Sequence, residues 1–252
     1  MLTNIRYILI TALRDWFFLG LLCGVVCATL ISATLGSTAF IEEKEMTITY
    51  AAGSCRLILM VGLIVFVCFH IRHAFDTKEI DVILSRPISR TNLVLAYWLG
   101  FSVVSLLLAL PVIGIVAVLG ILNGAGFAAW ATSLVLEALL VVALGLFSAL
   151  ALRSAVASVL ACMGFYVLSR MMAFFVITAQ SGIFNETKFE VLKWALVGLS
   201  TVVPRLDFFA QTEWLVYGLD SARDWQLFAL QAAIYIPVLL VASVLDFKRK
   251  QF

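Results

Sequence analysis

The sequence predicts an all-α, polytopic membrane protein with six transmembrane helices, all in one transmembrane domain that covers residues 1–252. Hydrophobic residues make up 63% of the chain and charged residues 13%, and the mean hydropathy is +1.10. A soluble domain carries about a quarter charged residues, so a globule of this composition could not cover its surface with polar side chains. Long uncharged runs also reach the roughly 20 residues that a helix needs to cross the hydrocarbon. The membrane is therefore the solvent of this protein.

Six spans follow from the uncharged runs. The first run, Trp16 to Ile41, exceeds the roughly 7–15 apolar residues of a signal peptide, so we interpret it as a span. The interior between Arg90 and Glu137 is uncharged, which is enough for one complete span, a tight turn at Asn123–Gly126 and the start of another. The predicted spans are 17–40, 52–72, 93–121, 129–151, 155–179 and 226–246.

The distribution of Lys and Arg predicts the orientation, because short cytoplasmic loops are enriched in both. It places both termini in the cytoplasm of a presumed bacterial cell, with the spans in its inner membrane. Arg170 falls inside a span. The predicted cytoplasmic set is Arg6, Arg14, Arg72, Lys78, Arg86, Arg90, Arg153, Lys248, Arg249 and Lys250, and the predicted outer set is Lys44, Arg56, Lys188, Lys193, Arg205 and Arg223.

Two segments outside the spans also have helical patterns. Apolar residues in 2–16 recur at helical spacing, which fits either an N-terminal helix on the inner leaflet or a plain extension of the first span. In the outer segment 180–225, a helical period runs from Lys188 to Val203 and ends at Pro204. Irregular backbone cannot face lipid, so we expect this piece to be a surface helix or a re-entrant one packed on protein.

A charged segment, "DTKEIDVILSRPISR" at residues 76–90, separates the second and third spans. Asp76 and Glu79 have the spacing of a capping box, an apolar stripe follows, and Pro87 disfavours helix at the residue before it. Ser89 is well placed to cap the third span. The pattern fits a helix of about two turns lying across the end of the bundle, or a solvated loop whose charges only enforce the topology.

The surrounding sequence favours the helix, because it resembles a known family. The stretch "FHIRHAFDTKEIDVILSRPISRTNLVLAYWLG" is similar to the loop of six-span permeases of type-2 ABC transporters, which have an acidic residue, a helix ending "LLS-[RK]-P-[IV]-[ST]-R" and a glycine early in span three. "VVPRLDFF" before the last span and the ending "FKRKQF" add to the likeness. Tyr97 departs from it, since a lysine is common there. The specific motif covers about thirty residues, close to the branch that contains the copper-maturation permease of nitrous-oxide reductase.

The resemblance implies a permease that pairs with a second copy of itself and with two copies of a separate ABC ATPase subunit, and that exports its substrate. Accessory subunits are left open. The charged segment would be the coupling helix, docked on the ATPase. The chain contains no Gly-Lys dipeptide and hence no P-loop, so we expect ATP hydrolysis on the partner and no enzymatic activity or cofactor in this chain. The ATPase-coupling residues would be Asp76, Lys78, Glu79, Asp81, Leu84, Ser85, Arg86 and Pro87.

Two other functions stay open: a membrane anchor or assembly subunit that transports nothing, and an intramembrane enzyme. An enzyme would need a cluster of metal ligands or paired carboxylates at one depth, and the sequence shows none. His70 and His73 have no evident third ligand, and the five cysteines lack metal-site spacing. The net charge of +2 gives no indication of nucleic-acid binding. The substrate is not predicted; a lipid, haem, drug, peptide or maturation factor would fit the mostly aliphatic, aromatic and small residues of the spans.

Two contacts inside the membrane are predicted from geometry. Glu137 and Arg170 lie 16 and 17 residues from the turn at Arg153, so they share a depth, and charged residues there usually pair. The alternative is that each side chain reaches the outer interface separately. Small residues at i, i+4 spacing allow close helix approach, which makes one face of the first span a candidate dimer contact: Gly20, Gly24, Ala28 and Ser32.

Overall fold

The computed structural model describes residues 11, 16–38, 42–80, 89–180, 198, 203–219 and 222–249. The described residues form helices and no strand, and five helices are long and apolar enough to cross a membrane. A sixth span results if a bent helix pair is counted as one. The elements are α2 (Trp16–Gly36), α3 (Glu43–Asp76), α5 (Arg90–Leu119), α6 (Gly124–Ala151), α7 (Ala155–Arg170), α8 (Met172–Gln180), η2 (Leu206–Phe208), α10 (Glu213–Tyr217) and α11 (Ala222–Arg249).

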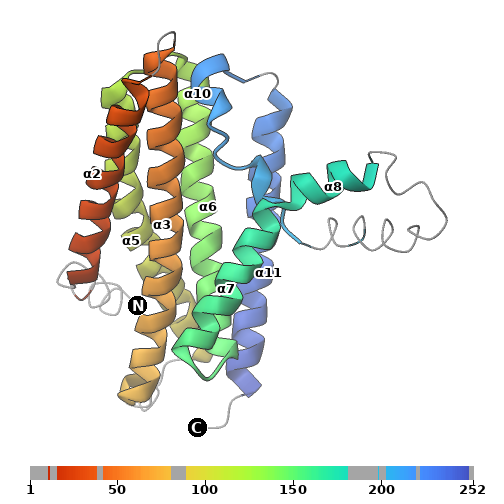
Figure 1. Ribbon diagram of the computed structural model, residues 1–252. Coiled ribbons are helices and arrows are strands. Elements are labelled where there is room, and N and C mark those ends of the chain that lie inside the picture. The colour runs from red at the N-terminus through yellow and green to blue at the C-terminus, as the bar shows by residue number, and fades with distance from the viewer. Residues whose placement is uncertain are drawn as a thin grey trace.

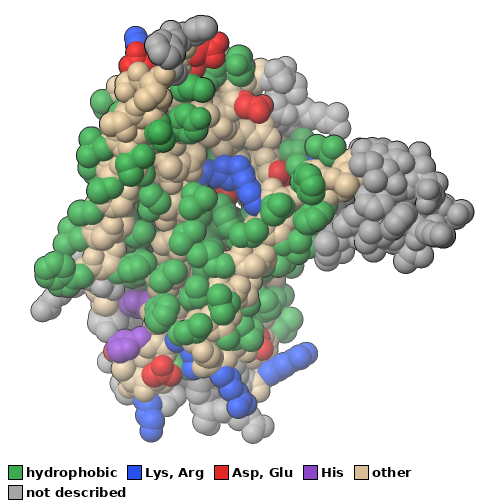
Figure 2. Space-filling view, in the orientation of Figure 1, with side chains coloured by type: hydrophobic (Ala, Val, Ile, Leu, Met, Phe, Trp, Pro, Cys, Tyr) green, Lys and Arg blue, Asp and Glu red, His purple; other side chains and the backbone are tan. Residues whose placement is uncertain are grey.

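The long helices stand side by side and alternate in direction along the chain (Figure 1). The end of α3, the start of α5, the turn between α6 and α7, and the end of α11 share one end of the bundle, at the bottom of Figure 1. We call it the basic end, because it carries exposed Lys78, Arg153, Lys248 and Arg249. The opposite end carries the exposed residues Glu42, Glu43, Lys44 and Glu213, and Figure 2 shows both acidic and basic side chains there.

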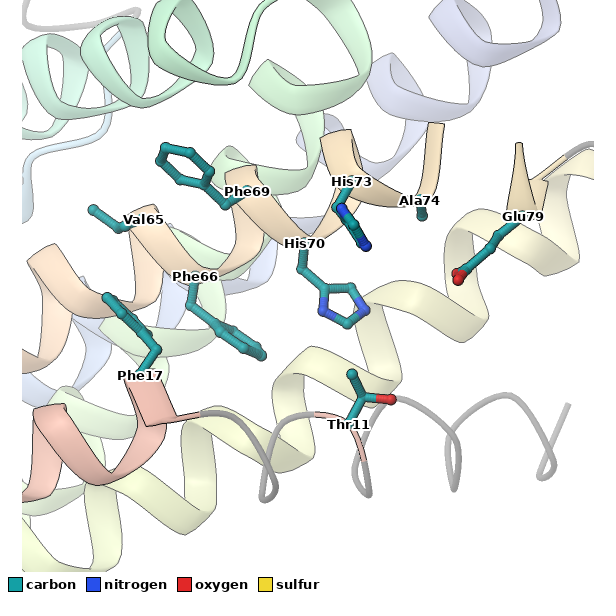
Figure 3. A pocket seen from close by; sticks show the side chains of 9 residues that line it. All are labelled: Thr11, Phe17, Val65, Phe66, Phe69, His70, His73, Ala74 and Glu79. Carbon is teal, nitrogen blue, oxygen red and sulfur yellow. The ribbon is translucent and has the colours of Figure 1, made fainter. Parts of the chain in front are cut away.

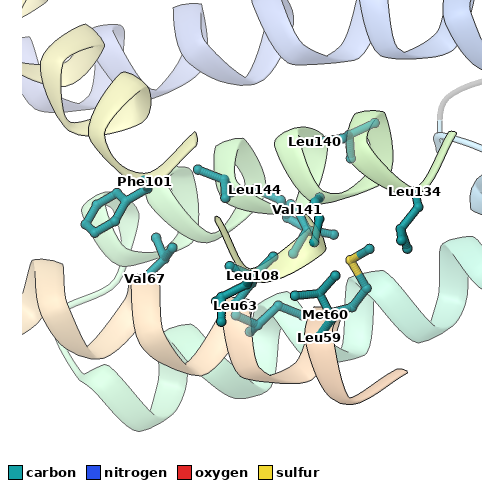
Figure 4. Packing of buried hydrophobic residues seen from close by; sticks show 14 of the residues in the cluster. Leu59, Met60, Leu63, Val67, Phe101, Leu108, Leu134, Leu140, Val141 and Leu144 are labelled. Carbon is teal, nitrogen blue, oxygen red and sulfur yellow. The ribbon is translucent and has the colours of Figure 1, made fainter. Parts of the chain in front are cut away.

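Helix α6 is the centre of the bundle and packs against α3, α5, α7, α10 and α11. Buried aliphatic side chains fill the space between α6, α3 and α5 (Figure 4). Helix α2 packs mainly on α3 and keeps much of its surface exposed. Because a membrane helix needs no burial of its apolar surface in protein, α2 can remain peripheral while α6 is enclosed.

Polar caps mark the starts of two of these helices. The Ser89 hydroxyl accepts a hydrogen bond from the Asn92 amide at 3.2 Å, which confirms it as the cap of α5. The Asn123 side chain accepts from the Gly126 amide at 2.9 Å, so α6 begins at Gly124 and the predicted turn at Asn123–Gly126 lies about three residues too late. Such caps satisfy amide donors that the first helical turn leaves without partners.

The predicted fifth span, 155–179, is not one straight helix. Helices α7 and α8 meet at Met171 with a bend of 46°. In Figure 1, α8 leads outward from the side of the bundle. Beyond it, residues 203–219 return to the bundle as η2 and α10 and bury Leu206, Phe209 and Trp214. This part of the outer segment therefore packs on protein, while most of the predicted helix 188–203 and the N-terminal segment 2–16 lie outside the described residues.

Candidate functional site

The predicted coupling segment begins at the basic end, but its start differs from the prediction. Asp76 is the last residue of α3, and its carboxylate lies 3.5 Å from the Arg72 guanidinium. Lys78 then adopts a φ of 57°, so the chain turns in the left-handed region before helical structure resumes at Glu79. The interpretation of Asp76 as the cap of a new helix is therefore wrong, because α3 runs four residues beyond the predicted end of the span.

The described start of this segment is anchored in the bundle. Ile80 is 2% exposed and borders a small void between α3, α5, α6 and α11, beside Leu93, Leu146 and Phe247. Glu79 is half-buried. The other predicted coupling residues, Asp81, Leu84, Ser85, Arg86 and Pro87, lie outside the described residues.

Arg72, shortly before the charged segment, and Arg90, its last residue, form hydrogen bonds with neighbouring parts of the bundle. The Arg72 guanidinium donates to the Leu152 carbonyl at 3.3 Å, which links α3 to the α6–α7 turn. Arg90 donates to the carbonyls of Phe247 and Lys248, both at 3.2 Å, and so caps the end of α11. A cation is favourable at a helix C-terminus, where carbonyl groups point outward. The hydrogen bonds of these two arginines thus connect four parts of the bundle: α3 with the α6–α7 turn, and α5 with the end of α11.

His70 and His73 line a pocket near the C-terminal end of α3, together with Glu79 and Phe17 (Figure 3). Its volume is about 600 Å³. The His70 ring stacks edge-on against Phe101 at 5.3 Å. Within the described part of the chain, no group of three His, Cys, Asp or Glu side chains is arranged to hold a metal ion. The His70 ring also lies 5.6 Å from that of Phe66.

A second polar site lies inside the bundle. We call it the buried charge cluster, and it consists of Arg56, Glu137, Tyr166 and Arg170. The Arg56 guanidinium donates to both carboxylate oxygens of Glu137, at 2.8 and 2.9 Å, and Glu137 is fully buried. The Tyr166 hydroxyl donates to the same carboxylate at 3.0 Å. A buried carboxylate needs such partners, because an unpaired one costs several kcal/mol.

The remaining donors of the cluster hold the returning segment 203–212. Arg56 Nη1 donates to the Ala210 carbonyl at 2.9 Å. Arg170 Nη1 donates to the carbonyls of Leu206 and Phe209. The Ala210 amide donates to the Ser133 hydroxyl at 2.9 Å. Irregular backbone at membrane depth is tolerated where protein satisfies its polar groups, and these side chains do so here.

The predicted ion pair between Glu137 and Arg170 is therefore wrong. Both residues belong to the cluster, and Arg170 lies within electrostatic range of Glu137, but the carboxylate pairs with Arg56. The chain bends directly after Arg170, and its guanidinium turns to the carbonyls of the returning segment. Glu137 does pair with a cation on a neighbouring helix, as predicted, but that cation is Arg56 on α3 and not Arg170 on α7.

Arg56 was predicted to belong to the outer cations, and this assignment is also wrong. It is 5% exposed. Arg56 lies thirteen residues after Glu43, the first residue of α3, and Glu137 likewise lies thirteen residues after Gly124, the first residue of α6. Both helices run in the same direction, so the two residues share a depth about 20 Å along their axes. If the start of this helix had been predicted at residue 43, the equal depths of Arg56 and Glu137 would have identified the pair.

The predicted dimer face is largely occupied within the chain. Ala28 and Ser32 are buried, the Ser32 hydroxyl lies 3.3 Å from that of Ser54 on α3, and Gly24 faces Ile58. Gly20 alone has open space around it. The small residues do permit close helix approach, as predicted, but the partner is α3 of the same molecule. The exposed face of α2 instead carries Val26, Leu30 and other apolar side chains.

In comparisons with known proteins, no family model and no curated protein matches the chain.

Proposed function

We propose that the chain is the membrane-spanning permease subunit of an ATP-driven transporter of the type-2 ABC class, acting as an exporter in a bacterial inner membrane. The single observation that carries the proposal is the charged segment at residues 76–90, which contains the family-like motif and whose described residue Ile80 is buried at the basic end. Its base contacts the ends of several long helices through Ile80, Arg72 and Arg90. A force applied there would reach the whole bundle.

In this proposal the basic end faces the cytoplasm and receives a separate ATPase. The excess of Lys and Arg at that end supports the orientation, because cytoplasmic loops are enriched in both residues. ATP binding and hydrolysis on two ATPase copies would move the segment, and the bundle would follow. A second copy of the chain would complete the transport pathway, and its contact surface would include exposed residues of α2 in place of the predicted small-residue face.

The test is a charge reversal in the coupling segment, Glu79→Lys with Asp81→Lys. We expect the chain to reach the membrane in normal amount but to lose the ATPase that purifies with the wild-type chain. The physical reason is that reversing charges at an interface juxtaposes like charges and weakens association by a few kcal/mol, on the order of a hundredfold in affinity. ATPase activity recovered with the tagged chain from native membranes measures the effect.

The matched control reverses two exposed carboxylates at the opposite end, Glu42→Lys with Glu43→Lys. It changes the net charge by the same amount and should retain the ATPase. If the coupling-segment variant also retains full ATPase recovery, the proposed docking is wrong. If even the wild-type chain brings no ATPase, the anchor or assembly function becomes the better explanation.

A further inference from the structure

A cavity opens on the side of the bundle, next to the buried charge cluster. Its volume is about 340 Å³, and α3 and α7 form its two sides. Figure 2 shows basic side chains in the middle of this face, surrounded by hydrophobic ones. The cavity therefore opens at a level where a membrane protein normally presents only apolar groups to lipid. The lining residues are Gly53, Arg56, Leu57, Tyr166, Val167, Arg170, Met171 and Thr212.

The described residues around this cavity carry one excess positive charge. Glu137 neutralises Arg56 through two hydrogen bonds. Asp207 neutralises Arg205 at 2.8 Å. Among the described residues, no carboxylate lies within ion-pair distance of Arg170; Glu137 and Asp207 lie within electrostatic range, and its hydrogen-bond partners are neutral carbonyl groups. An uncompensated guanidinium inside a membrane bundle is costly, so an anion that reached it would be strongly favoured.

Arg170 also keeps donors for such an anion. Its hydrogen bonds to the described residues all come from Nη1. The side chain is half-buried and lines the cavity, so Nε and Nη2 remain for a ligand. These two groups form the edge of the guanidinium fork that binds carboxylate and phosphate oxygens in parallel.

The mouth of the cavity is apolar, in contrast to its charged interior. Leu57, Val167 and Met171 line it and are 60%, 51% and 47% exposed. A ligand that matches both parts has one anionic group for the interior and an apolar chain for the rim. Small-molecule sites combine mostly apolar walls with a few placed polar groups in the same way, with volumes of about 300–1,000 Å³.

We propose that this cavity binds one monoanionic amphiphile, with its phosphate diester or carboxylate on Arg170 and its alkyl chain along the apolar rim. The single negative charge matches the single excess positive charge. The two sources of this chemistry are a phospholipid and a fatty acid. The inference does not rest on the transporter assignment, because binding requires neither the ATPase nor transport.

The experiment measures ligand retention by native mass spectrometry of the purified full-length chain. The probes are phosphatidylglycerol against phosphatidylcholine with identical acyl chains, and oleate against oleyl alcohol. Each pair differs in net charge and keeps the chain. We expect one copy of at least one anionic probe to bind about tenfold more tightly than its partner, which is the size of one or two hydrogen bonds to a charged group. The pair that shows the preference identifies the source.

Two substitutions locate the site. Arg170→Gln should abolish the preference for the anionic probe, and Arg170→Lys should retain part of it, because lysine keeps the charge but loses the fork. Since Arg170→Gln removes bonds to the returning segment and could prevent folding, Gly53→Leu provides a second test. A Cβ at Gly53 meets only Thr212, at 3.9 Å, so a side chain can begin there, and leucine would take up space in the cavity while every charged residue stays in place.

Gly164→Leu is the matched control, since it is a helical glycine on α7 with open space around it and does not line the cavity. It should bind like the wild type, whereas Gly53→Leu should lose retention. The proposal is overturned if neither anionic probe is preferred, or if Gly53→Leu binds as well as Gly164→Leu. It is also overturned if inorganic phosphate displaces the anionic probe at equal concentration, because the alkyl chain would then contribute nothing.

Discussion

Arg56 and Glu137 illustrate how a buried ion pair can be both costly and necessary. Each charge loses its hydration inside the bundle, and the attraction between them offsets that loss only because the geometry is bidentate and the other lone pairs and donors have partners. Tyr166 and the Ala210 carbonyl supply those partners. The pair thus holds α3, α6, α7 and the returning segment in one arrangement.

Removing one member of this pair should destabilise the protein strongly. We expect Arg56→Gln and Glu137→Gln each to lower the free energy of unfolding by about 3–5 kcal/mol, because each leaves the other charge buried without its counter-ion. The double variant should lose less than the sum of the two. Thermal unfolding of the purified chain in detergent, analysed as a double-mutant cycle, measures the three values.

The surface pair Arg72–Asp76 provides the comparison. The Asp76 side chain is 71% exposed, so Asp76→Asn should change stability by no more than about 1 kcal/mol. Additive losses in the Arg56 and Glu137 cycle would contradict the buried pair. So would an Asp76→Asn variant as unstable as Glu137→Gln.

At this scale the sequence identified Glu137 and Arg170 as residues that need partners, because charges at membrane depth are rare. It could not identify the partner, for two physical reasons. The polar start of α3, "EKEMTITY" at 43–50, has the composition of a loop, so Arg56 was assigned to the outside. The carbonyls of Leu206 and Phe209 depend on how a returning segment folds, and no local pattern in the sequence predicts that.

Among the helices, the start of α6 packs closely against α10. A Cβ added at Gly126 would lie 1.8 Å from the Trp214 carbonyl oxygen, whereas one at Gly124 would meet nothing within 4 Å. Both glycines lie in the first turn of α6. The absence of a side chain at Gly126 is therefore what lets α10 rest against α6.

We expect Gly126→Ala to lower the free energy of unfolding by about 1–3 kcal/mol, the usual cost of overpacking. Gly124→Ala should leave it unchanged or raise it by up to about 1 kcal/mol, because alanine restricts the unfolded chain more than glycine does. The two variants are compared by thermal unfolding in the same detergent. Equal effects from both would show that α10 does not pack on α6 as described.

The lengths and ends of the helices were predicted unevenly. Hydropathy located the apolar centres of the five long helices, and a side-chain cap located the start of α5. The bend at Met171 was not predicted, because neither proline nor glycine occurs there and nothing local breaks the helical pattern. The bend directly follows Arg170, whose side chain binds the returning segment, so the bend depends on a tertiary interaction.

For the whole molecule, the separation of charge between the two ends predicts the orientation in the membrane. Single cysteines at Thr38 and Ser154, in a background without the five native ones, would report it. Both positions are exposed and uncharged, and the Ser154 side chain caps no helix. The substitutions therefore leave the charge distribution that orients the chain unchanged.

A membrane-impermeant thiol reagent should label Thr38→Cys in intact spheroplasts and label Ser154→Cys only after lysis. The unsubstituted cysteine-free chain controls for background labelling. Labelling of Ser154→Cys in intact cells, with protection of Thr38→Cys, would invert the assignment and place the basic end outside.

The sequence separation of the buried pair has a consequence for biogenesis. Arg56 and Glu137 are 81 residues apart, and ribosomes add roughly 5–20 residues per second. Arg56 is therefore synthesised roughly 4–16 s before its counter-ion, and the carbonyl group of Ala210 follows later still. During that interval α3 carries an unpaired cation into the insertion machinery. Nascent chains arrested before residue 137 should leave α3 extractable from the membrane, and chains that include α6 should retain it.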